Sequence, residues 1–330
     1  MPFEIEIEIC LTFFIYHVLK GIVGTTHICP MVLKQIVFKQ MAICPTHLHL
    51  TIFLTHRPMT YPTHLSAPSD FIIAQISDLH LSTHIPTNTD KFLKVLDFAL
   101  TFKPNLLLLT GDLVNDGHLP LYDWLFDTLD KTNTPYLCLA GNHDVTHEMG
   151  HDLPFDKRTF FPIAKDDRLI DTHRLVIDLP HATWQLLAVN SALHGHIYGR
   201  LDDGQLAFLK THLVHAMPAL IALHHHPTPV GSAWIDEHML QNGNEFWAIL
   251  NAHTTNTTNR PHVLCGHVHQ AHILQQNGGT LYTCPATSRQ FAPHRDEFGI
   301  DDVASGFRLL QLHNNRTLDT WVKRLDNSGF

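Results

Sequence analysis

From residue 70 onward, continuous apolar runs alternate with stretches of helical periodicity. The runs at 71–76, 106–109 and 136–140 are typical of strands that are buried on both faces. Residues 91–102 and 121–129 place apolar positions three and four residues apart, as an amphipathic helix does. This half of the chain is therefore predicted to fold as strand, helix, strand, helix, strand.

The following half is richer in predicted strands. One amphipathic segment, residues 203–215, predicts a helix. Strands are expected at 175–179, 184–189, 219–223, 263–265, 272–275, 280–283, 307–312 and 318–322. Periodicity alone supports an α/β or α+β domain and no finer architecture.

Polar motifs follow several apolar runs, at the points where the strands are predicted to end. Side chains at the carboxyl ends of neighbouring strands converge in open α/β sheets, and glycines there permit tight turns. In chain order the motifs are Ser77-Asp78-Leu79-His80, Gly111-Asp112, Gly141-Asn142-His143-Asp144, the lone His224, and Gly266-His267-Val268-His269.

Together these motifs offer oxygen and nitrogen ligands for metal ions. Asp78 and His80 are one residue apart, as are His267 and His269, so on extended segments both side chains of a pair point the same way. The carboxylate of Asp112 has two oxygens and can be shared between two ions. Mixed donors of this kind suit Mn, Fe, Zn or Co better than Ca. The seven candidate ligands are Asp78, His80, Asp112, Asn142, His224, His267 and His269.

The high histidine content weakens any single motif. The chain has 29 histidines in 330 residues, so a His-x-His pair such as His267 and His269 can arise by chance. Gly141-Asn142-His143-Asp144 is much rarer, and all the motifs in one order are rarer still. His225 and His226 directly follow His224 and are alternatives to it as ligands; we expect them to line the cleft or pack.

Net charge and cysteine usage narrow the partners. The formal net charge is −9, so no general electrostatic field attracts nucleic acid or an anionic membrane, and we expect neither as a partner. A small anionic substrate would then need local positive charge, which metal ions supply. The six cysteines include no CxxC pair, so we expect buried, reduced thiols and a cytoplasmic location.

The N-terminal residues 1–68 do not share the pattern of the rest. The apolar run at 9–24 is short for a membrane span, and the acidic start is unlike a secretory signal. We expect an extension outside the fold or an overlong start, with Met59 as the true start and Met41 as the second candidate. The functional domain is then expected at 69–330.

On these motifs and their order, the chain resembles the calcineurin-like metallophosphoesterase superfamily. The resemblance implies a four-layer sandwich, in which two mixed β-sheets pack face to face with helices outside. It also implies two divalent ions, with Fe²⁺ or Mn²⁺ expected first and Zn²⁺ or Co²⁺ as alternatives. The implied first site is Asp78, His80, Asp112 and His269, and the implied second site is Asp112, Asn142, His224 and His267.

The resemblance further implies roles in the hydrolysis of a phosphate ester. A hydroxide held between the two ions attacks phosphorus in line, with Asp112 shared by both ions. His143 stabilises the transition state and protonates the leaving oxygen, and Asp144 orients that imidazole or supports the turn. Substrate contacts are implied for His80, Asn142, His143, His224 and His269.

Later segments resemble one branch, the bacterial class III cyclic-nucleotide phosphodiesterases, within a catalytic domain at 69–330. This branch hydrolyses 3′,5′-cyclic AMP to 5′-AMP, which makes a cyclic nucleotide the expected partner. The alternatives are another small phosphodiester or phosphomonoester, such as a glycerophosphodiester or nucleotide, and a non-catalytic metal-binding scaffold, against which the intact ligand set argues. The oligomeric state stays open, with a homodimer among the expectations. The segments are 223–227, 231–236 with Trp234, 264–270, and 284–294 with Phe291.

Overall fold

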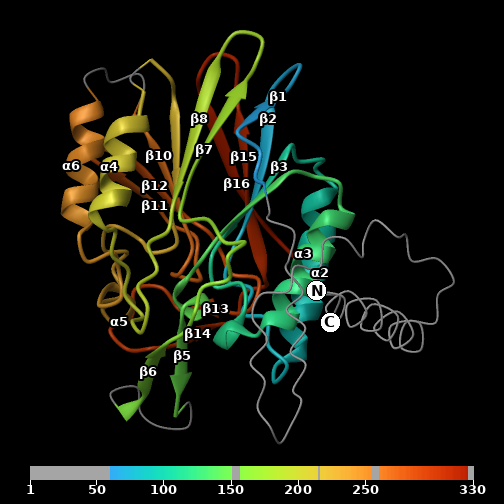
Figure 1. Ribbon diagram of the computed structural model, residues 1–330, viewed down its shortest axis with the longest axis vertical. Coiled ribbons are helices and arrows are strands. Elements are labelled where there is room, and N and C mark those ends of the chain that lie inside the picture. The colour runs from blue at the N-terminus through green and yellow to red at the C-terminus, as the bar shows by residue number, and fades with distance from the viewer. Residues whose placement is uncertain (1–59, 151–156, 215, 255–259, 326–330) are drawn as a thin grey trace, which may run out of the picture. The chain divides into compact units, whose positions relative to one another are not determined.

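The computed structural model describes residues 60–150, 157–214, 216–254 and 260–325 (Figure 1). The expected extension at 1–68 lies mostly outside the described residues, as do both proposed start positions, Met59 and Met41. No helix within the described ranges combines the length and the apolar character needed to span a membrane.

The described elements alternate between strands and helices in the first half and are mostly strands afterwards, as the apolar pattern predicted. The helices are α2 (Pro86–Leu100), α3 (Leu119–Lys131), α4 (Asp203–His212), α5 (Ala233–Asp236) and α6 (Gly243–His253), with short 3-10 turns η2 (Asn115–Gly117) and η3 (Asn142–Asp144). The strands are β1 (His64–Ser66), β2 (Phe71–Ile76), β3 (Leu106–Thr110), β4 (Tyr136–Leu139), β5 (Thr146–Met149), β6 (Thr159–Pro162), β7 (Thr172–Asp178), β8 (Thr183–Val189), β9 (Ala219–Ala222), β10 (His262–Cys265), β11 (Ile273–Gln276), β12 (Gly279–Thr283), β13 (Gln290–Phe291), β14 (Ile300–Asp301), β15 (Gly306–Leu312) and β16 (Leu318–Arg324).

Two mixed sheets form the centre of the domain. The five-stranded sheet has the order β16-β15-β2-β3-β4, in which β2, β3 and β4 are parallel. The seven-stranded sheet has the order β1-β7-β8-β9-β10-β12-β11, in which β8, β9, β10 and β12 are parallel. Parallel neighbours place their carboxyl ends at one edge, which is where the sequence predicted the polar motifs.

The main hydrophobic core lies between the two sheets. It joins Leu106 and Leu108 of β3 to Leu186 of β8 and Leu220 of β9, all fully buried. Alternate residues of β8 and β9, such as Leu187 and Ile221, belong to another cluster on the outer face, since side chains of a strand alternate between faces. Both faces of the central strands are therefore buried, which explains their continuous apolar runs.

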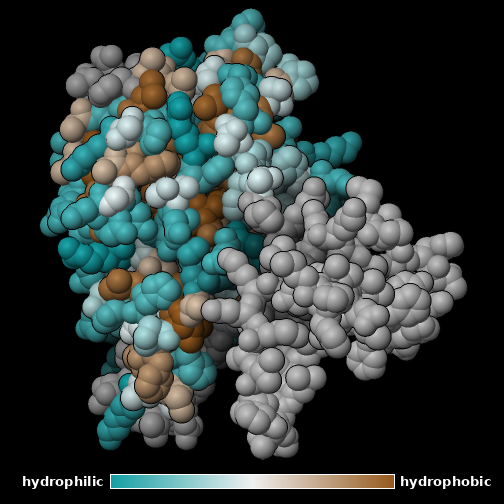
Figure 2. All heavy atoms as spheres, in the orientation of Figure 1, coloured by the Kyte–Doolittle hydropathy of each residue, from teal (hydrophilic) through white to brown (hydrophobic). Residues whose placement is uncertain are grey.

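Helices cover the outer faces of both sheets (Figure 1). Leu209 of α4, and Phe246 and Leu250 of α6, pack in the outer cluster of the seven-stranded sheet. Phe98 of α2 contacts Phe307 of β15 at a ring-centroid distance of 5.6 Å on the five-stranded sheet. The space-filling view shows hydrophilic residues over much of the described face, with apolar residues interspersed (Figure 2). This arrangement confirms the predicted four-layer sandwich.

Some boundaries differ from the prediction for identifiable reasons. Helix α2 begins at Pro86, five residues before the predicted start at residue 91, because a proline is favourable in the first turn of a helix. Helix α4 begins after Asp202, which forms a capping box with Gln205. Helix α6 was not predicted, although its buried Phe246 and Leu250 have helical spacing.

Strand β1 lies inside the segment that the sequence assigned to the extension. Its residues His64–Ser66 pair in parallel with β7, and Ala67 donates a backbone hydrogen bond to Asp178. The seven-stranded sheet therefore includes residues that precede the predicted domain start at 69. The interpretation of residues 1–58 as a segment outside the fold stays a prediction.

Candidate metal centre

All seven predicted ligands lie in the loops that follow the carboxyl ends of five strands: β2, β3, β4, β9 and β10. The two sheets meet at this edge. Gln75 of β2 donates from Nε2 to the carbonyl of Cys265 on β10 at 3.1 Å, and the backbone N–H of His267 donates to Oδ1 of Asp78 at 3.0 Å. Ligand-type residues from both sheets are thereby brought to one place.

The first group comprises Asp78, His80, Asp112 and His269. Their ligand-type atoms all lie within 4.8 Å of one another. Nε2 of His80 lies 3.0 Å from Nε2 of His269 and 3.5 Å from Oδ2 of Asp112. Nε2 of His269 lies 3.4 Å from Oδ1 of Asp78. The structure thus brings together the four residues that the resemblance implied for the first site.

The two facing imidazole nitrogens of His80 and His269 are suited to hold a cation between them. Nδ1 of His80 lies 2.9 Å from Oδ1 of Asn115, and Nδ1 of His269 donates to the carbonyl of Arg289 at 2.8 Å. With Asn115 oriented in this way, each ring in its neutral form carries its proton on Nδ1, and the two Nε2 lone pairs then point at each other. Two nitrogen ligands at right angles, each about 2.1 Å from one ion, are about 3.0 Å apart.

The second group also contacts Asp112. Nε2 of His224 is 3.3 Å from Oδ1 of Asn142 and 3.4 Å from Oδ2 of Asp112, and its Nδ1 donates to the carbonyl of Thr110 at 2.7 Å. The rings of His224 and His267 are 5.1 Å apart. Nε2 of His267 is buried and has no hydrogen-bond partner among the described residues. This unpaired nitrogen and the amide and carboxylate oxygens suit a second ion.

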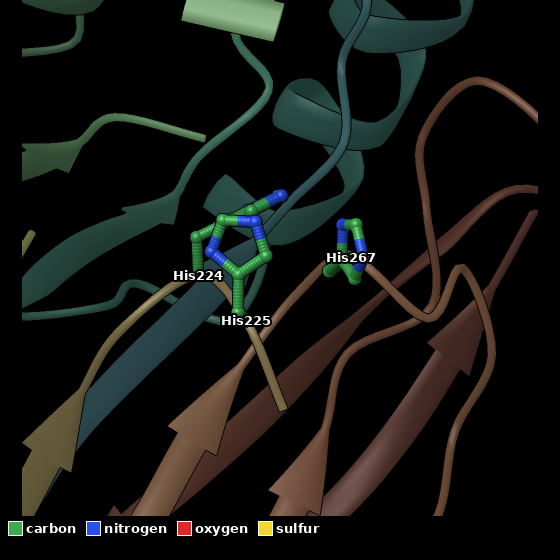
Figure 3. A group of neighbouring side chains, drawn as sticks. All are labelled: His224, His225 and His267. Carbon is green, nitrogen blue, oxygen red and sulfur yellow. The ribbon is translucent and has the colours of Figure 1, made fainter. Parts of the chain in front are cut away.

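His225 also lies beside this second group. Its ligand-type nitrogen lies within 4.8 Å of those of His224 and His267, and the three side chains stand at the ends of the neighbouring strands β9 and β10 (Figure 3). Both of its ring nitrogens are already engaged, however: Nδ1 with the hydroxyl of Ser191 and Nε2 with the carbonyl of Ile197, each at 2.9 Å. His225 therefore packs against the group, whereas Nε2 of His224 faces the oxygens of Asn142 and Asp112.

Comparison with known proteins gives the family. The sequence model of calcineurin-like phosphoesterases matches residues 71–271. The chain belongs to this family. Its members use a dimetal centre, and the two groups above are the candidate residues for one here.

Two relatives within the family match this chain over most of their own length. A protein of Moraxella catarrhalis, named probable cyclic nucleotide phosphodiesterase, is 43% identical over 264 residues, which cover 78% of this chain and 94% of that protein. The 3′,5′-cyclic adenosine monophosphate phosphodiesterase CpdA of Escherichia coli K12 is 32% identical over 271 residues, which cover 78% of this chain and 91% of the relative.

Solved structures share the fold at low identity. Plasmodium GAP50, described as the anchor in the inner membrane complex, matches with a TM-score of 0.50 at 11% identity, over 78% of this chain and 89% of that one. The purple acid phosphatase PPD1 of yellow lupin matches with a TM-score of 0.50 at 13% identity, over 81% and 55%. These likenesses support the phosphoesterase architecture alone.

Burial and neighbouring charges shift the pKa values of the candidate metal ligands in opposite directions. Burial lowers the pKa of His80 to about 3, against the pull of Asp112, so this ring is neutral and able to ligate. Burial also lowers the pKa of His224, but the Asp112 carboxylate outweighs it and raises that pKa to about 9. The pKa of Asp112 is well below its usual value because the imidazoles of His224 and His143 outweigh its burial. The carboxylate that would be shared is thus ionised, and a metal ion would replace the proton on His224.

The backbone of the site differs from the prediction. Asp78 and His80 have φ values of 55° and 47°, and His267 and His269 have 66° and 50°. The interpretation of both pairs as extended alternation is wrong, because all four residues are in the left-handed region. Aspartate and histidine tolerate this region better than most residues, and such conformations concentrate at functional sites. A Cβ at Gly111, whose φ is 95°, would overlap the ring of His224, so the predicted role of that glycine is confirmed.

His143 and Asp144 have separate positions. The backbone N–H of His143 donates to Oδ1 of Asp112 at 2.9 Å, and its half-buried ring packs edge-on against His80 with centroids 4.7 Å apart. The buried Asp144 carboxylate accepts from the backbone N–H groups of Gly141, Leu113 and Val114 at 2.8–3.1 Å and from the Tyr122 hydroxyl. Of its two predicted roles, Asp144 fulfils support of the turn, because it ties the Asp112 loop to the Asn142 loop.

Sequence reasoning missed the groups that orient the ligands. Asn115 holds the ring of His80, Asn88 donates to the His80 carbonyl at 2.9 Å, and the carbonyl of Arg289 holds His269. A carbonyl group has no sequence signature. Asn115 had one weak signal, its place three residues after Asp112 in a segment that must turn back toward the site.

Proposed function

We propose that this protein is a metal-dependent phosphodiesterase that hydrolyses 3′,5′-cyclic AMP to 5′-AMP. One observation carries the catalytic part: the Nε2 atoms of His80 and His269 face each other at 3.0 Å beside Asp78 and Asp112. Family membership supports phosphoester chemistry. The substrate comes from relatives named as cyclic nucleotide and cyclic AMP phosphodiesterases, at 43% and 32% identity along most of the domain.

We assign the seven side chains to two ions that share Asp112. Two bound divalent ions would polarise the phosphate oxygens and lower the pKa of a water that they hold. The nitrogen and oxygen donors suit Fe²⁺ or Mn²⁺, with Zn²⁺ and Co²⁺ as further candidates. The proposed sets are Asp78, His80, Asp112 and His269 for one ion and Asp112, Asn142, His224 and His267 for the other.

The remaining chemistry falls to side chains at the rim. Hydrolysis forms a bond from a water oxygen to phosphorus and breaks the bond from phosphorus to O3′, which leaves 5′-AMP. We assign stabilisation of the transition state and delivery of a proton to O3′ to the half-buried ring of His143, which contacts His80. We also assign substrate contacts to His80, Asn142, His224 and His269.

A cytoplasmic location belongs to the same proposal. Cys138, Cys265 and Cys284 are buried and unpaired, and burial raises the pKa of the Cys284 thiol to about 12, so it is protonated and unreactive. Unpaired thiols are typical of a reducing compartment, which is also where a cyclic nucleotide messenger would be met.

The test is turnover of cyclic AMP by the full chain after metal removal and after refilling with Mn²⁺ or Fe²⁺, beside a generic aryl phosphodiester. We expect no activity in the stripped protein and metal-dependent formation of 5′-AMP after refilling. Hydrolysis of the aryl diester with cyclic AMP untouched would retain the metal chemistry and move the substrate to another phosphodiester. Two bound ions without activity on either substrate would revive the scaffold alternative.

A further inference from the structure

An aromatic cluster extends from the candidate metal centre to the protein surface. The ring of Phe291 stacks flat on that of His269, with centroids 4.0 Å apart and planes 7° apart. Trp234 and Phe298 continue from Phe291: the three rings meet edge to face, with centroid distances of 4.9–5.4 Å. We call Trp234, Phe291 and Phe298 the aromatic wall. It begins at a residue that we assign to the first ion.

The aromatic wall is held by hydrogen bonds to the segment that carries His269. Phe291 donates its backbone N–H to the carbonyl of His269 at 3.2 Å, and Gln270 donates to the carbonyl of Phe291 at 3.2 Å. Strands β13 and β14 pair Phe291 with Ile300, which sets the position of Phe298 in the turn between them. This pairing brings the segment that carries Phe298 next to Phe291.

Trp234 is anchored from the other side. Asp236, two residues later, accepts backbone hydrogen bonds from Val230, Gly231 and Ser232 at 2.8–3.1 Å. Nε2 of His226 lies 3.2 Å from the same carboxylate, which connects this loop to the histidine run at the end of β9. The segments 223–227 and 231–236, which resemble the cyclic-nucleotide branch, are joined by these contacts into one loop. Holding this loop gives a physical reason for the resemblance of both segments.

The outer end of the aromatic wall is exposed to solvent. Phe298 is 55% exposed, while Phe291 and Trp234 are half-buried. The indole N–H of Trp234 is buried and has no hydrogen-bond partner in the described part of the chain. The exposed aromatic face of Phe298 is a favourable environment for a planar group that stacks on it.

We propose that the aromatic wall binds the nucleobase of the substrate, with the base stacked on Phe298, and that it favours a purine. This inference rests on the proposed function. In a cyclic nucleotide, a single ribose separates the phosphorus from the base. In the protein, the rings of His269 and Phe291 separate Phe298 from the side of His269 that faces the proposed ion. Phosphorus near the ions would therefore put the base near Phe298. A purine offers a larger stacking face than a pyrimidine.

A second copy of this chain is the competing occupant. A stable interface buries about 800 Å² on each partner, whereas a whole aromatic side chain contributes about 150–250 Å². The neighbouring residues of the turn, 293–297, are exposed and include charged side chains. Ile300 and Val303 are also exposed, so three apolar side chains stand here beside charged neighbours. A stable interface needs about 20–30 residues on each side, so a patch of this size fits a small aromatic ligand better than a protein surface.

The experiment compares two substrates in the full-length, metal-loaded protein. One is cyclic AMP and the other is the 3′,5′-cyclic phosphate of methyl riboside, which has the same diester without a base. We expect Phe298→Ala to raise KM for cyclic AMP about tenfold, the factor that corresponds to about 1.4 kcal/mol of base stacking, with kcat within about twofold. KM for the base-free diester should not change. Phe298→Tyr should restore the KM for cyclic AMP.

A matched control is Trp321→Ala on β16, which removes another exposed aromatic ring, 41% exposed, and should leave KM unchanged for both substrates. Equal changes for both substrates in Phe298→Ala, or no change, would overturn the inference while leaving the proposed function intact. A change of oligomeric state in size-exclusion chromatography, with KM unchanged, would assign the ring to a contact between copies and overturn it as well.

A binding measurement separates this inference from the reaction. Saturation-transfer NMR with 5′-AMP reports whether the adenine protons contact the protein, without turnover. If the wild type hydrolysed neither diester, the proposed function would fail. The saturation-transfer signal alone would then show whether the aromatic wall binds the base. Adenine transfer that is lost in Phe298→Ala supports it, and absence of transfer in the wild type rules it out.

Discussion

Strand β2 carries a histidine and carboxylate cluster at each of its ends, and the two clusters behave differently. At its start, His313, which follows β15, lies between two carboxylates: its Nδ1 is 2.8 Å from Asp70 and its Nε2 is 3.0 Å from Asp319. At its other end, the carboxylates of Asp78 and Asp112 stand 3.4–3.5 Å from imidazole nitrogens, and two imidazole nitrogens face each other. The residue types are the same.

The difference is one of hydrogen-bond balance. At the start of β2 one ring has two donors and each carboxylate accepts one of them, so a protonated His313 satisfies the cluster without help. At the carboxyl end the Nδ1 atoms are already occupied by Asn115 and Arg289, and lone pairs fill the centre. The comparison teaches that histidine and aspartate content does not make a metal site, whereas groups that fix the ring tautomers do.

The largest effect is expected from Asp112→Ala, because this residue alone belongs to both groups. Its removal leaves each ion without a ligand and each group without its central charge. We expect loss of both ions and a fall in turnover of at least about 10³-fold, equivalent to several kcal/mol. Elemental analysis and kinetics with cyclic AMP check this. A correctly folded variant with near wild-type activity would refute the shared-carboxylate arrangement; Asp112→Asn, which keeps the shape, is the matched control.

His224 and His225 give the next test, because they are adjacent and both buried. His224→Ala should reduce the bound metal from two ions to one and lower turnover by about 10²-fold or more. His225→Ala should keep both ions, since its two nitrogens are engaged with Ser191 and Ile197. This variant should lose about 1–3 kcal/mol in the free energy of unfolding, because the Ser191 hydroxyl and the Ile197 carbonyl lose their hydrogen-bond partner. The reverse pattern of metal content would transfer the ligand role to His225.

Part of the candidate metal centre at the carboxyl end of β2 could be predicted from the sequence, and part could not. Asp78, Asp112 and Asn142 were found because each follows a recognisable apolar strand, and parallel strands bring such positions together. Choosing His224 required the family resemblance, since three histidines in a row are indistinguishable by pattern. The left-handed backbone at His80 and His269 was mispredicted, because it depends on contacts between loops far apart in the chain.

Asn115 sharpens the comparison, because it fixes the tautomer of His80 from 35 positions away. Asn115→Ala should weaken binding of the first ion by about 10–100-fold and leave the second less affected. Titration of the metal-loaded protein with a competing chelator gives a separate affinity for each ion, and this measurement does not depend on turnover. Asn115→Asp retains the acceptor and should restore the affinity. Equal weakening of both ions, or no rescue, would instead point to a general loss of structure.

The smallest effect is expected at the start of β2, where no ion is needed. Although its partial burial lowers the pKa of His313, hydrogen bonds to Asp319 and Asp70 raise it above 6.5. A raised folded-state pKa means that the stabilisation is full below the unfolded-state pKa of about 6.5 and is lost as pH rises through the folded-state value.

His313→Gln should therefore reduce the free energy of unfolding near pH 5.5 by at most about 1 kcal/mol, because the cluster is exposed, and by less near pH 9. Metal content should stay unchanged. Urea unfolding at the two pH values measures the difference, and His181→Gln, at an exposed histidine on the turn between β7 and β8, serves as control. A larger effect at high pH would show that His313 is neutral in the folded protein, and the contrast between the two ends of β2 would then have another cause.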